Sequence, residues 1–249
     1  MKLPRVLVVD DDPDILAVLE IRLQAMGLDV SLATNDREAL TLLEDRGFDG
    51  TQAEVITAWG NLSLRLALAG RPNLLNVLAA VTVALESGVE PSEVTRVTSS
   101  LEAVPRRGAL STLANGARLV DDSYNASPAA VNAMLATLAV TPVTGRRIAV
   151  IGEMRELGDE ARAWHAECGR AAAHAGVDML VASGGSAADG VVDGAREGGL
   201  DGQRILRFAD SASAAEPIAA LLKSGDLILV NGSRGTRTDI VADRLKAVA

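Results

Sequence analysis

The second half of the sequence repeats one pattern, in which a short apolar run is followed by a longer segment with helical periodicity. Continuous apolar runs are typical of strands that are buried on both faces of a parallel sheet. Their alternation with helices predicts an α/β fold, a doubly wound Rossmann-like domain that binds ligands at the carboxyl ends of its strands. The expected strands are 117–121, 147–151, 178–182, 204–207 and 226–230, and the expected helices are 128–139, 159–175, 186–196, 211–223 and 234–247.

The first half of the chain begins with the same alternation and then departs from it. Strands are expected at 6–9 and 30–32, and helices at 13–27 and 36–46. No third buried strand follows. Instead, two segments that alternate apolar and polar residues predict a β-hairpin with one wet face, followed by two helices. The hairpin strands are 53–57 and 62–66, and the helices run from Asn73 to Ser87 and from Pro91 to Leu101.

Composition narrows the class of protein and its compartment. The 249 residues are 48% hydrophobic and contain no apolar run of the roughly 18–20 residues that a membrane helix needs. The opening residues lead directly into a strand, so neither a signal peptide nor a membrane partner is expected. The single cysteine, Cys168, fits a reducing, cytoplasmic compartment. A net charge of -9 argues against a nucleic-acid partner.

Two acidic residues, Asp10 and Asp11, follow the first expected strand. Carboxylates at the end of a parallel strand can hold Mg²⁺. The structural alternative is that Asp12 caps the next helix and its neighbours are solvated. Residues 1–49 resemble the first half of a response-regulator receiver domain, and this resemblance implies a Mg²⁺ site at Asp10 and Asp11. The phospho-accepting aspartate that such domains place shortly after this segment is absent.

A second group of polar residues lies at the ends of expected elements in residues 50–249. Asn76 is in the first turn of an apolar helix, where asparagine usually serves as a cap. Asp122 follows a strand, and Arg107 belongs to a pair of arginines that has a simple interpretation as a solvated surface pair. The loop with Ser233 and Arg234 precedes the last helix, where backbone N–H groups can receive an anion.

The order of the motifs is more specific than any one of them. GRPNLLNVLAA, VPRRGAL, LVDDSYNASPAAV, IAVIGEMRELGDEARAWH and LILVNGSRGTR follow one another as they do in the Mur ligase family. Residues 50–249 resemble this family, and DDSYNASP and GEMRELGDEA are similar to its members that add D-alanyl-D-alanine to UDP-muramoyl tripeptide in peptidoglycan precursor synthesis. The resemblance implies these two substrates, with ATP and Mg as cofactors.

The resemblance also implies roles for individual residues. Asn76 would lie near the adenine of ATP, Arg107 would reach a phosphate, and Asp122 would hold the ribose. Ser233 and Arg234 would help to seat the incoming amino substrate. These are expectations carried from the family, position by position.

Several positions depart from the family's pattern. Pro72 stands in place of a usual histidine, Arg106 in place of a glycine, and Asn231 in place of a lysine. The change at Asn231 alters the charge of the loop before the last helix. His165 matches a common histidine of the family, and a structural role on its helix is expected.

The sequence lacks a phosphate-binding loop of the form G-x-x-x-x-G-K-[ST], and lysine occurs only at positions 2, 223 and 246. These 249 residues by themselves are therefore expected not to catalyse ligation. The expected domains are a receiver-like fragment, the tail of a Mur ligase central domain, and its C-terminal domain. A receiver-like signalling module and a non-functional chimera are the alternatives. The boundaries are 1–49, 50–100 and 101–249, with a junction near Gly50.

Overall fold

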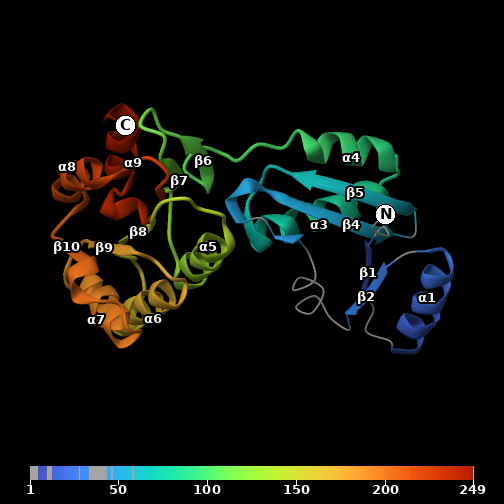
Figure 1. Cartoon of the computed structure of the whole chain (residues 1–249), viewed down its shortest axis with the longest axis horizontal. Coiled ribbons are helices and arrows are strands. Elements are labelled where there is room, and N and C mark those ends of the chain that lie inside the picture. Colours follow the sequence, from blue (N-terminus) through green and yellow to red (C-terminus); the bar gives the residue numbers. More distant parts are fainter. Residues whose placement is uncertain are drawn as a thin grey trace. The chain divides into compact units, whose positions relative to one another are not determined.

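The computed structural model describes most of the chain and divides it into two compact units (Figure 1). Unit 1 is Met1–Leu101 and unit 2 is Glu102–Ala249. The finer division into three domains stays a prediction. The described residues are 5–9, 13–27, 29–33, 44–45, 47–57 and 59–248.

Unit 2 is built on a six-stranded sheet. Its strands are β6 (Ala109–Thr112), β7 (Arg118–Asp122), β8 (Arg147–Gly152), β9 (Met179–Ser183), β10 (Ile205–Phe208) and β11 (Leu227–Asn231). The strand order is β10-β9-β8-β11-β7-β6, and every pair is parallel except β6 with β7. Because β11 is inserted between β7 and β8, the carboxyl ends of these three strands are neighbours.

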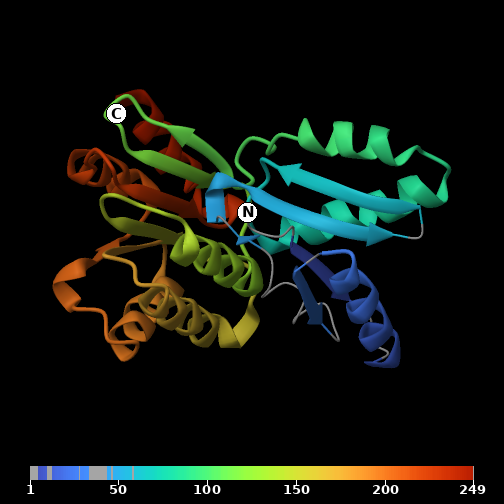
Figure 2. The same ribbon diagram turned by 45° about the vertical axis from the view of Figure 1, so that its right-hand side comes forward.

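Helices cover both faces of this sheet. They are α5 (Pro128–Val140), α6 (Ala161–His174), α7 (Asp189–Glu197), α8 (Ser211–Leu221) and α9 (Asp239–Val248). Helices α8 and α9 share a core with strand residues such as Leu119 and Val230, whereas α5, α6 and α7 lie on the opposite side (Figure 2). Adjacent strand residues such as Leu119 and Val120 are both fully buried, which explains the continuous apolar runs. The expected α/β fold with a mostly parallel sheet is confirmed.

Two features of unit 2 differ from the expected elements. The sequence pattern does not identify β6, because this edge strand is short and its residues are only half-buried or exposed. The last helix begins at Asp239 rather than at residue 234. Arg234–Thr236 form a single 3-10 turn, and Arg237 then adopts a left-handed φ of 55° that an α-helix cannot contain.

Unit 1 contains the expected hairpin and the two helices that cover it. Its elements are β3 (Glu44–Asp45), β4 (Thr51–Thr57), β5 (Gly60–Leu66), α3 (Gly70–Glu86) and α4 (Pro91–Ser99). Strands β4 and β5 pair in antiparallel fashion. Leu62, Leu64 and Leu66 are buried in a core with α3 and α4, while the intervening residues of β5 are exposed. The hairpin therefore has one wet face.

The N-terminal part of unit 1 is a strand–helix–strand segment. β1 (Arg5–Val9) pairs in parallel with β2 (Asp29–Ala33), and α1 (Pro13–Ala25) lies between them in sequence. The helix expected at 36–46 falls mostly outside the described residues. Its described part, Glu44–Asp45, is strand β3 because it pairs with the start of β4, so a helix through these residues is wrong. Asp10 and Asp11 lie outside the described residues.

Among the described helices, none combines the length and the apolar character that a membrane span requires.

Candidate functional site

The candidate site lies at the carboxyl edge of the unit 2 sheet, where β7, β8 and β11 end side by side. Parallel α/β sheets bind ligands at this edge, because the strand ends and the following loops leave backbone and side-chain groups exposed there. Polar side chains of the candidate site come from the loop before β6 and from the loops after β7, β8 and β11.

Asp122 is the last residue of β7, and its carboxylate is only partly compensated. Asn231 Nδ2 donates to Asp122 Oδ2 at 2.5 Å, and the Gly108 N–H also hydrogen-bonds this carboxylate. Burial, with a smaller contribution from the charge of Asp121, raises the pKa of Asp122 to about 6, although the Gly108 hydrogen bond and the charge of Arg107 act in the opposite direction. A perturbed carboxyl at a ligand-binding edge is typical of a functional group.

The preceding residue, Asp121, has a different environment. Its carboxylate accepts hydrogen bonds from Lys246 Nζ at 2.5 Å and from Ser123 Oγ at 2.6 Å, and the residue is 1% exposed. Successive strand residues point to opposite faces of a sheet. Asp121 therefore ties β7 to α9, while Asp122 remains available at the edge.

Arg107 is an exposed residue whose guanidinium lies over an aromatic ring. Its Cζ atom is 4.1 Å from the centroid of the Tyr124 ring. The two loops that carry these residues are joined by a hydrogen bond from the Tyr124 N–H to the Arg106 carbonyl, at 3.1 Å. The cation–π contact orients Arg107 without neutralising its charge, which suits a cation that meets an anionic ligand.

The backbone conformation at Arg106 suits the glycine that the resembled family has at this position. Its φ is 65°, in the left-handed region that glycine enters at little cost. The arginine side chain makes compensating contacts with α9, through ion pairs to Asp239 at 2.7 Å and Asp243 at 2.9 Å. These pairs anchor the loop that carries Arg107.

Asn231 is the second departure from the family's pattern, and it is fully buried. Its Nδ2 donates to Asp122, whereas its Oδ1 has no hydrogen-bond partner within the described part of the chain. A neutral amide here brings no positive charge to Asp122. The raised pKa of Asp122 is consistent with that neutral neighbour.

Ser233 and Arg234 follow Asn231 in the loop after β11. Ser233 is 3% exposed, and its hydroxyl accepts a hydrogen bond from the Arg155 N–H at 3.0 Å. It therefore links the loops after β8 and β11. Arg234 is exposed and lines a pocket of about 450 Å³. The other residues that line the pocket are Arg106, Ser123, Tyr124, Arg237 and Asp239.

The structure brings four of the predicted site residues to one edge of unit 2: Arg107, Asp122, Ser233 and Arg234. Asn76 belongs to α3 of unit 1, where it is exposed and lines an apolar pocket of about 330 Å³ formed with α4.

Within the described ranges, no group of three or more His, Cys, Asp or Glu residues could hold a metal ion. The predicted Mg²⁺ ligands Asp10 and Asp11 are outside those ranges, so the Mg²⁺ site stays a prediction.

His165 has the structural role that its place on a helix suggests. It is fully buried; its Nε2 accepts the Met154 N–H at 2.8 Å, and its Nδ1 lies 2.6 Å from the Ala161 carbonyl. An N–H group can only donate, so Nε2 carries no proton and Nδ1 donates to Ala161. The neutral ring connects α6 to the loop after β8.

The sequence pattern alone did not identify Tyr124 as a functional residue. A signal was available, because this residue is the only tyrosine of the chain and lies two positions after Asp122. Arg155 and Lys246 have no comparable sequence signal, since their contacts depend on which strands are neighbours.

These features define a doubly wound α/β domain with a candidate site, which carries exposed arginines, at the carboxyl edge of its sheet. Residues 106–234 match the family described as "Mur ligase, glutamate ligase domain". The chain belongs to the Mur ligase family.

Two curated relatives are UDP-N-acetylmuramoyl-tripeptide--D-alanyl-D-alanine ligases. The Escherichia coli K12 enzyme is 33% identical over 200 residues, covering 79% of this chain and 42% of the relative. The Mycobacterium tuberculosis H37Rv enzyme is 33% identical over 202 residues, covering 74% and 39%. The chain thus spans about two fifths of the length of these relatives.

Solved structures extend the similarity of fold to almost the whole chain. A MurF structure from Acinetobacter baumannii matches with a TM-score of 0.73 and 24% identity, over 99% of this chain and 53% of that one. MurF ligase from Thermotoga maritima, in complex with ADP, matches with a TM-score of 0.68 and 23% identity, over 98% and 53%. This coverage includes most of residues 1–49, and the comparisons give no support for a receiver domain there.

Proposed function

We propose that this chain provides the nucleotide-facing and amino-substrate-facing part of a cytoplasmic, ATP-dependent ligase. The reaction would join D-alanyl-D-alanine to UDP-muramoyl tripeptide, a step of peptidoglycan precursor synthesis. The observation that supports this proposal most directly is the position of Arg107, stacked on Tyr124 beside the partly compensated carboxylate of Asp122. The names of the Escherichia coli and Mycobacterium tuberculosis relatives describe the same reaction.

The chemistry of each group suits the role proposed for it. Arg107 offers a guanidinium, which is always charged and matches the geometry of a phosphate group. Asp122 offers a carboxylate that can accept hydrogen bonds from the hydroxyl groups of a ribose. Asn76 offers an exposed amide, which can both donate to and accept from the edge of an adenine ring.

The loop after β11 supports the amino-substrate side of the proposal. Ser233 fixes this loop by accepting the Arg155 N–H, which leaves the exposed side chain of Arg234 to meet a ligand. A guanidinium binds a carboxylate with two parallel hydrogen bonds. Arg234 is therefore proposed to contact the carboxylate of the incoming substrate.

The described residues contain no cluster of three or more His, Cys, Asp or Glu that could hold Mg²⁺. The 249 residues also contain no G-x-x-x-x-G-K-[ST] loop to hold the phosphates of ATP. Expressed by themselves, they are expected to bind nucleotide weakly and to release no phosphate from ATP.

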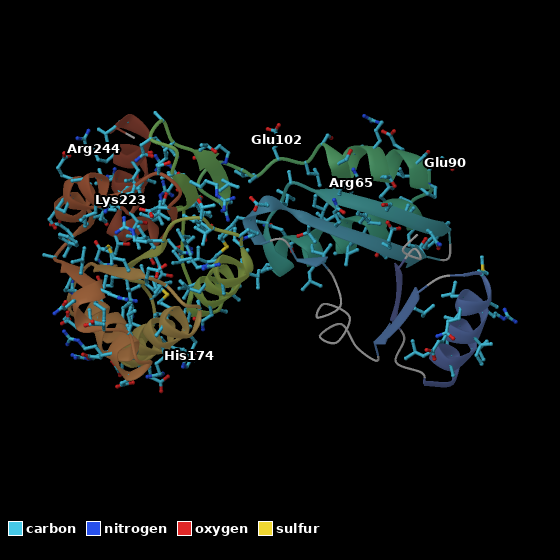
Figure 3. All side chains as sticks on the ribbon, in the orientation of Figure 1. Arg65, Glu90, Glu102, His174, Lys223 and Arg244 are labelled. Atoms are coloured by element: carbon cyan, nitrogen blue, oxygen red, sulfur yellow. The ribbon has the colours of Figure 1, made fainter. Side chains whose placement is uncertain are left out.

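Nucleotide binding by the 249-residue chain tests the proposal. Titration with ADP, followed by the amide resonances of Arg107, Gly108 and Tyr124, should show a saturable shift. The Arg107→Ala variant should bind about tenfold more weakly, because it loses a charge-assisted hydrogen bond to phosphate. The control is Arg244→Ala on α9, a residue that pairs with Glu216 outside the candidate site (Figure 3). Equal affinity of Arg107→Ala and the unmodified chain would contradict the proposal.

A further inference from the structure

The loop after β8 is held by three successive backbone N–H groups, each bonded to a different element. The Glu153 N–H donates to the Ser183 carbonyl at the end of β9, at 2.8 Å. The next N–H, of Met154, donates to His165 on α6, and that of Arg155 donates to Ser233 after β11. A loop fixed in this way holds its side chains in defined directions. Met154 is 2% exposed, whereas Glu153 and Arg155 are both more exposed.

The carboxylate of Glu153 is nearly buried but has few partners. Its side chain is 12% exposed, and Oε2 accepts one backbone hydrogen bond, from the Gly185 N–H at 3.1 Å. In the described part of the chain, Oε1 has no hydrogen bond. The nearest cationic atom, Arg155 Nη2, is 3.6 Å from Oε2, which is too long for a hydrogen bond. Because Oε1 is unpaired within the described ranges and not fully buried, a donor from a ligand can reach it.

The neighbouring turn is shaped around this carboxylate. Gly184 has a φ of 136°, and a Cβ atom at this position would lie 2.4 Å from the Cβ of Glu153. Only glycine therefore fits beside Glu153. The turn itself is fixed by Arg207, whose Nη2 donates to the carbonyls of Gly184 and Gly185 at 3.0 and 2.6 Å. The loop after β8 and the turn after β9 thus fix the position of Glu153 together.

Two cationic side chains, Arg155 and Arg234, belong to the loops after β8 and β11. The Arg155 side chain is 60% exposed and runs past Gly235, from which an added Cβ would be 3.6 Å from Arg155 Cγ. Gly235 directly follows Arg234 in the loop after β11. An under-compensated carboxylate and two exposed guanidinium groups on adjoining loops form a charge pattern that complements a zwitterion.

We propose that Glu153 binds the ammonium group of the incoming amino substrate and that Arg155 and Arg234 bind its carboxylate. The ligand class is a zwitterionic amino acid or short peptide with a free amino terminus. This inference rests on the proposed function and deepens it, because it names the group that recognises the amine. An ammonium group supplies the donors that Oε1 lacks, and it does so with a full positive charge.

The test is binding of D-alanyl-D-alanine to the 249-residue chain, followed by the amide resonances of Arg155 and Gly185. The Glu153→Gln variant keeps the shape of the side chain and removes its charge. It should bind D-alanyl-D-alanine about tenfold or more weakly, because a charge-assisted hydrogen bond is lost. Glu160→Gln, an exposed glutamate before α6, is the matched control and should bind as the unmodified chain does.

A second ligand makes the test independent of the variant's folding. N-acetyl-D-alanyl-D-alanine has no ammonium group, so it should bind the unmodified chain about tenfold more weakly than the parent dipeptide. Glu153→Gln should not change the affinity for this acetylated ligand. Equal binding of the two dipeptides to the unmodified chain would overturn the proposal. So would an unchanged affinity of Glu153→Gln, or the absence of any shift with D-alanyl-D-alanine.

Failure of this inference is distinguishable from failure of the proposed function. ADP shifts at Arg107 without any effect of D-alanyl-D-alanine would overturn the role of Glu153 and leave the nucleotide role standing. Dipeptide binding that depends on Glu153, without ADP binding, would support the role of Glu153 and overturn the nucleotide role of Arg107.

Discussion

Two aspartates in the same sheet of unit 2 have opposite electrostatic environments. Asp226 lies immediately before β11, at the amino edge of the sheet, and Asp122 ends the neighbouring strand β7 at the carboxyl edge. Asp226 is buried and Asp122 is half-buried. Burial raises the pKa of a carboxyl group unless hydrogen bonds and positive charges compensate, so the difference between the two depends on their partners.

Asp226 is fully compensated. Its Oδ1 accepts from the N–H and Nε of Arg146, and its Oδ2 accepts from Arg146 Nη2 at 2.6 Å and from the Lys223 N–H at 2.8 Å. Burial acts to raise its pKa, but the hydrogen bonds from Arg146 and Lys223 outweigh burial and lower it. Asp226 therefore stays ionised and joins the starts of β8 and β11.

Among the residues that the structure describes, Asp122 has only an amide and a backbone N–H as hydrogen-bond partners, and its pKa rises to about 6. Its incomplete compensation costs stability, which a purely structural carboxyl would not require. The comparison suggests how to separate structural from functional carboxyl groups in this fold: the structural one is saturated by the protein, and the functional one retains capacity for a ligand.

The largest expected effect comes from removing the partner of Asp226. The Arg146→Met variant leaves a 2%-exposed carboxylate without its cation, and the free energy of unfolding should fall by about 3 kcal/mol. Urea denaturation at pH 7, followed by Trp164 fluorescence in a Trp59→Phe background, measures the effect on unit 2. Arg244→Met, which removes an exposed pair with Glu216, is the control and should change stability little.

The pH dependence of this loss provides a further check. Because the folded-state pKa of Asp226 is lowered, its stabilising contribution is present above its ordinary pKa and is lost as the pH falls. The cost of Arg146→Met should therefore shrink in acid. An equal loss of stability in Arg146→Met and Arg244→Met would contradict the structural role of Asp226.

The Asp122→Asn variant should change the free energy of unfolding in the opposite direction, by increasing it. A pKa of about 6 in place of 3.8 corresponds to about 3 kcal/mol at 1.36 kcal/mol per pKa unit, and partial solvent contact reduces this to about 2 kcal/mol. The wild-type chain loses this stability as the pH rises from about 4 through 6, whereas the variant does not. Above pH 7, Asp122→Asn should therefore be more stable than wild type.

Denaturation at pH 4.5 and pH 7.5 measures this difference. The variant's advantage should be small at the lower pH and largest at the higher one. The amide of Asn231 can turn so that its unpartnered Oδ1 accepts from the new amide, which limits any loss of hydrogen bonding. A variant that is less stable than wild type at pH 7.5 would show that Asp122 is compensated after all.

Arg106 tests how the loop beside Asp122 is held. Arg106→Ala loses both ion pairs to α9 and keeps the left-handed φ of 65°. Arg106→Gly loses the same pairs but relieves the strained backbone. The glycine variant should therefore be more stable than the alanine variant by about 1 kcal/mol. Denaturation curves of the two variants measure the difference, and equal stabilities would mean that the loop relaxes away from this conformation.

Much of the fold followed from the sequence because the signals were local. The apolar runs that become β7, β8, β9 and β11 are buried on both faces, so their pattern did not depend on knowing their neighbours. The start of α9 was harder to predict from the sequence. Arg237 adopts a left-handed φ, and arginine is not a residue type that indicates such a conformation.

The site was less predictable because its contacts depend on topology. The contact between Asn231 and Asp122 exists because β11 enters the sheet beside β7, and nothing in the local sequence states that order. The contact of Arg155 with Ser233 has the same origin, since β11 also pairs with β8. Arg107 and Asp122 were found through the family resemblance, and their proposed roles stay predictions.

The smallest expected effect concerns Tyr124, whose ring orients Arg107, a cation that acts to lower the pKa of Asp122. Tyr124→Leu removes the ring that lies 4.1 Å from the Arg107 guanidinium, while Tyr124→Phe keeps the ring and removes only the hydroxyl. A cation–π contact at an exposed site is worth about 0.5–1 kcal/mol. ADP affinity should therefore fall roughly two- to fivefold in Tyr124→Leu and stay unchanged in Tyr124→Phe.

Because the leucine side chain still covers apolar surface, a loss confined to this variant reports on orientation of Arg107. Equal losses in both variants would instead assign the effect to the hydroxyl, and no loss in either would mean that Arg107 meets its ligand without help from the ring.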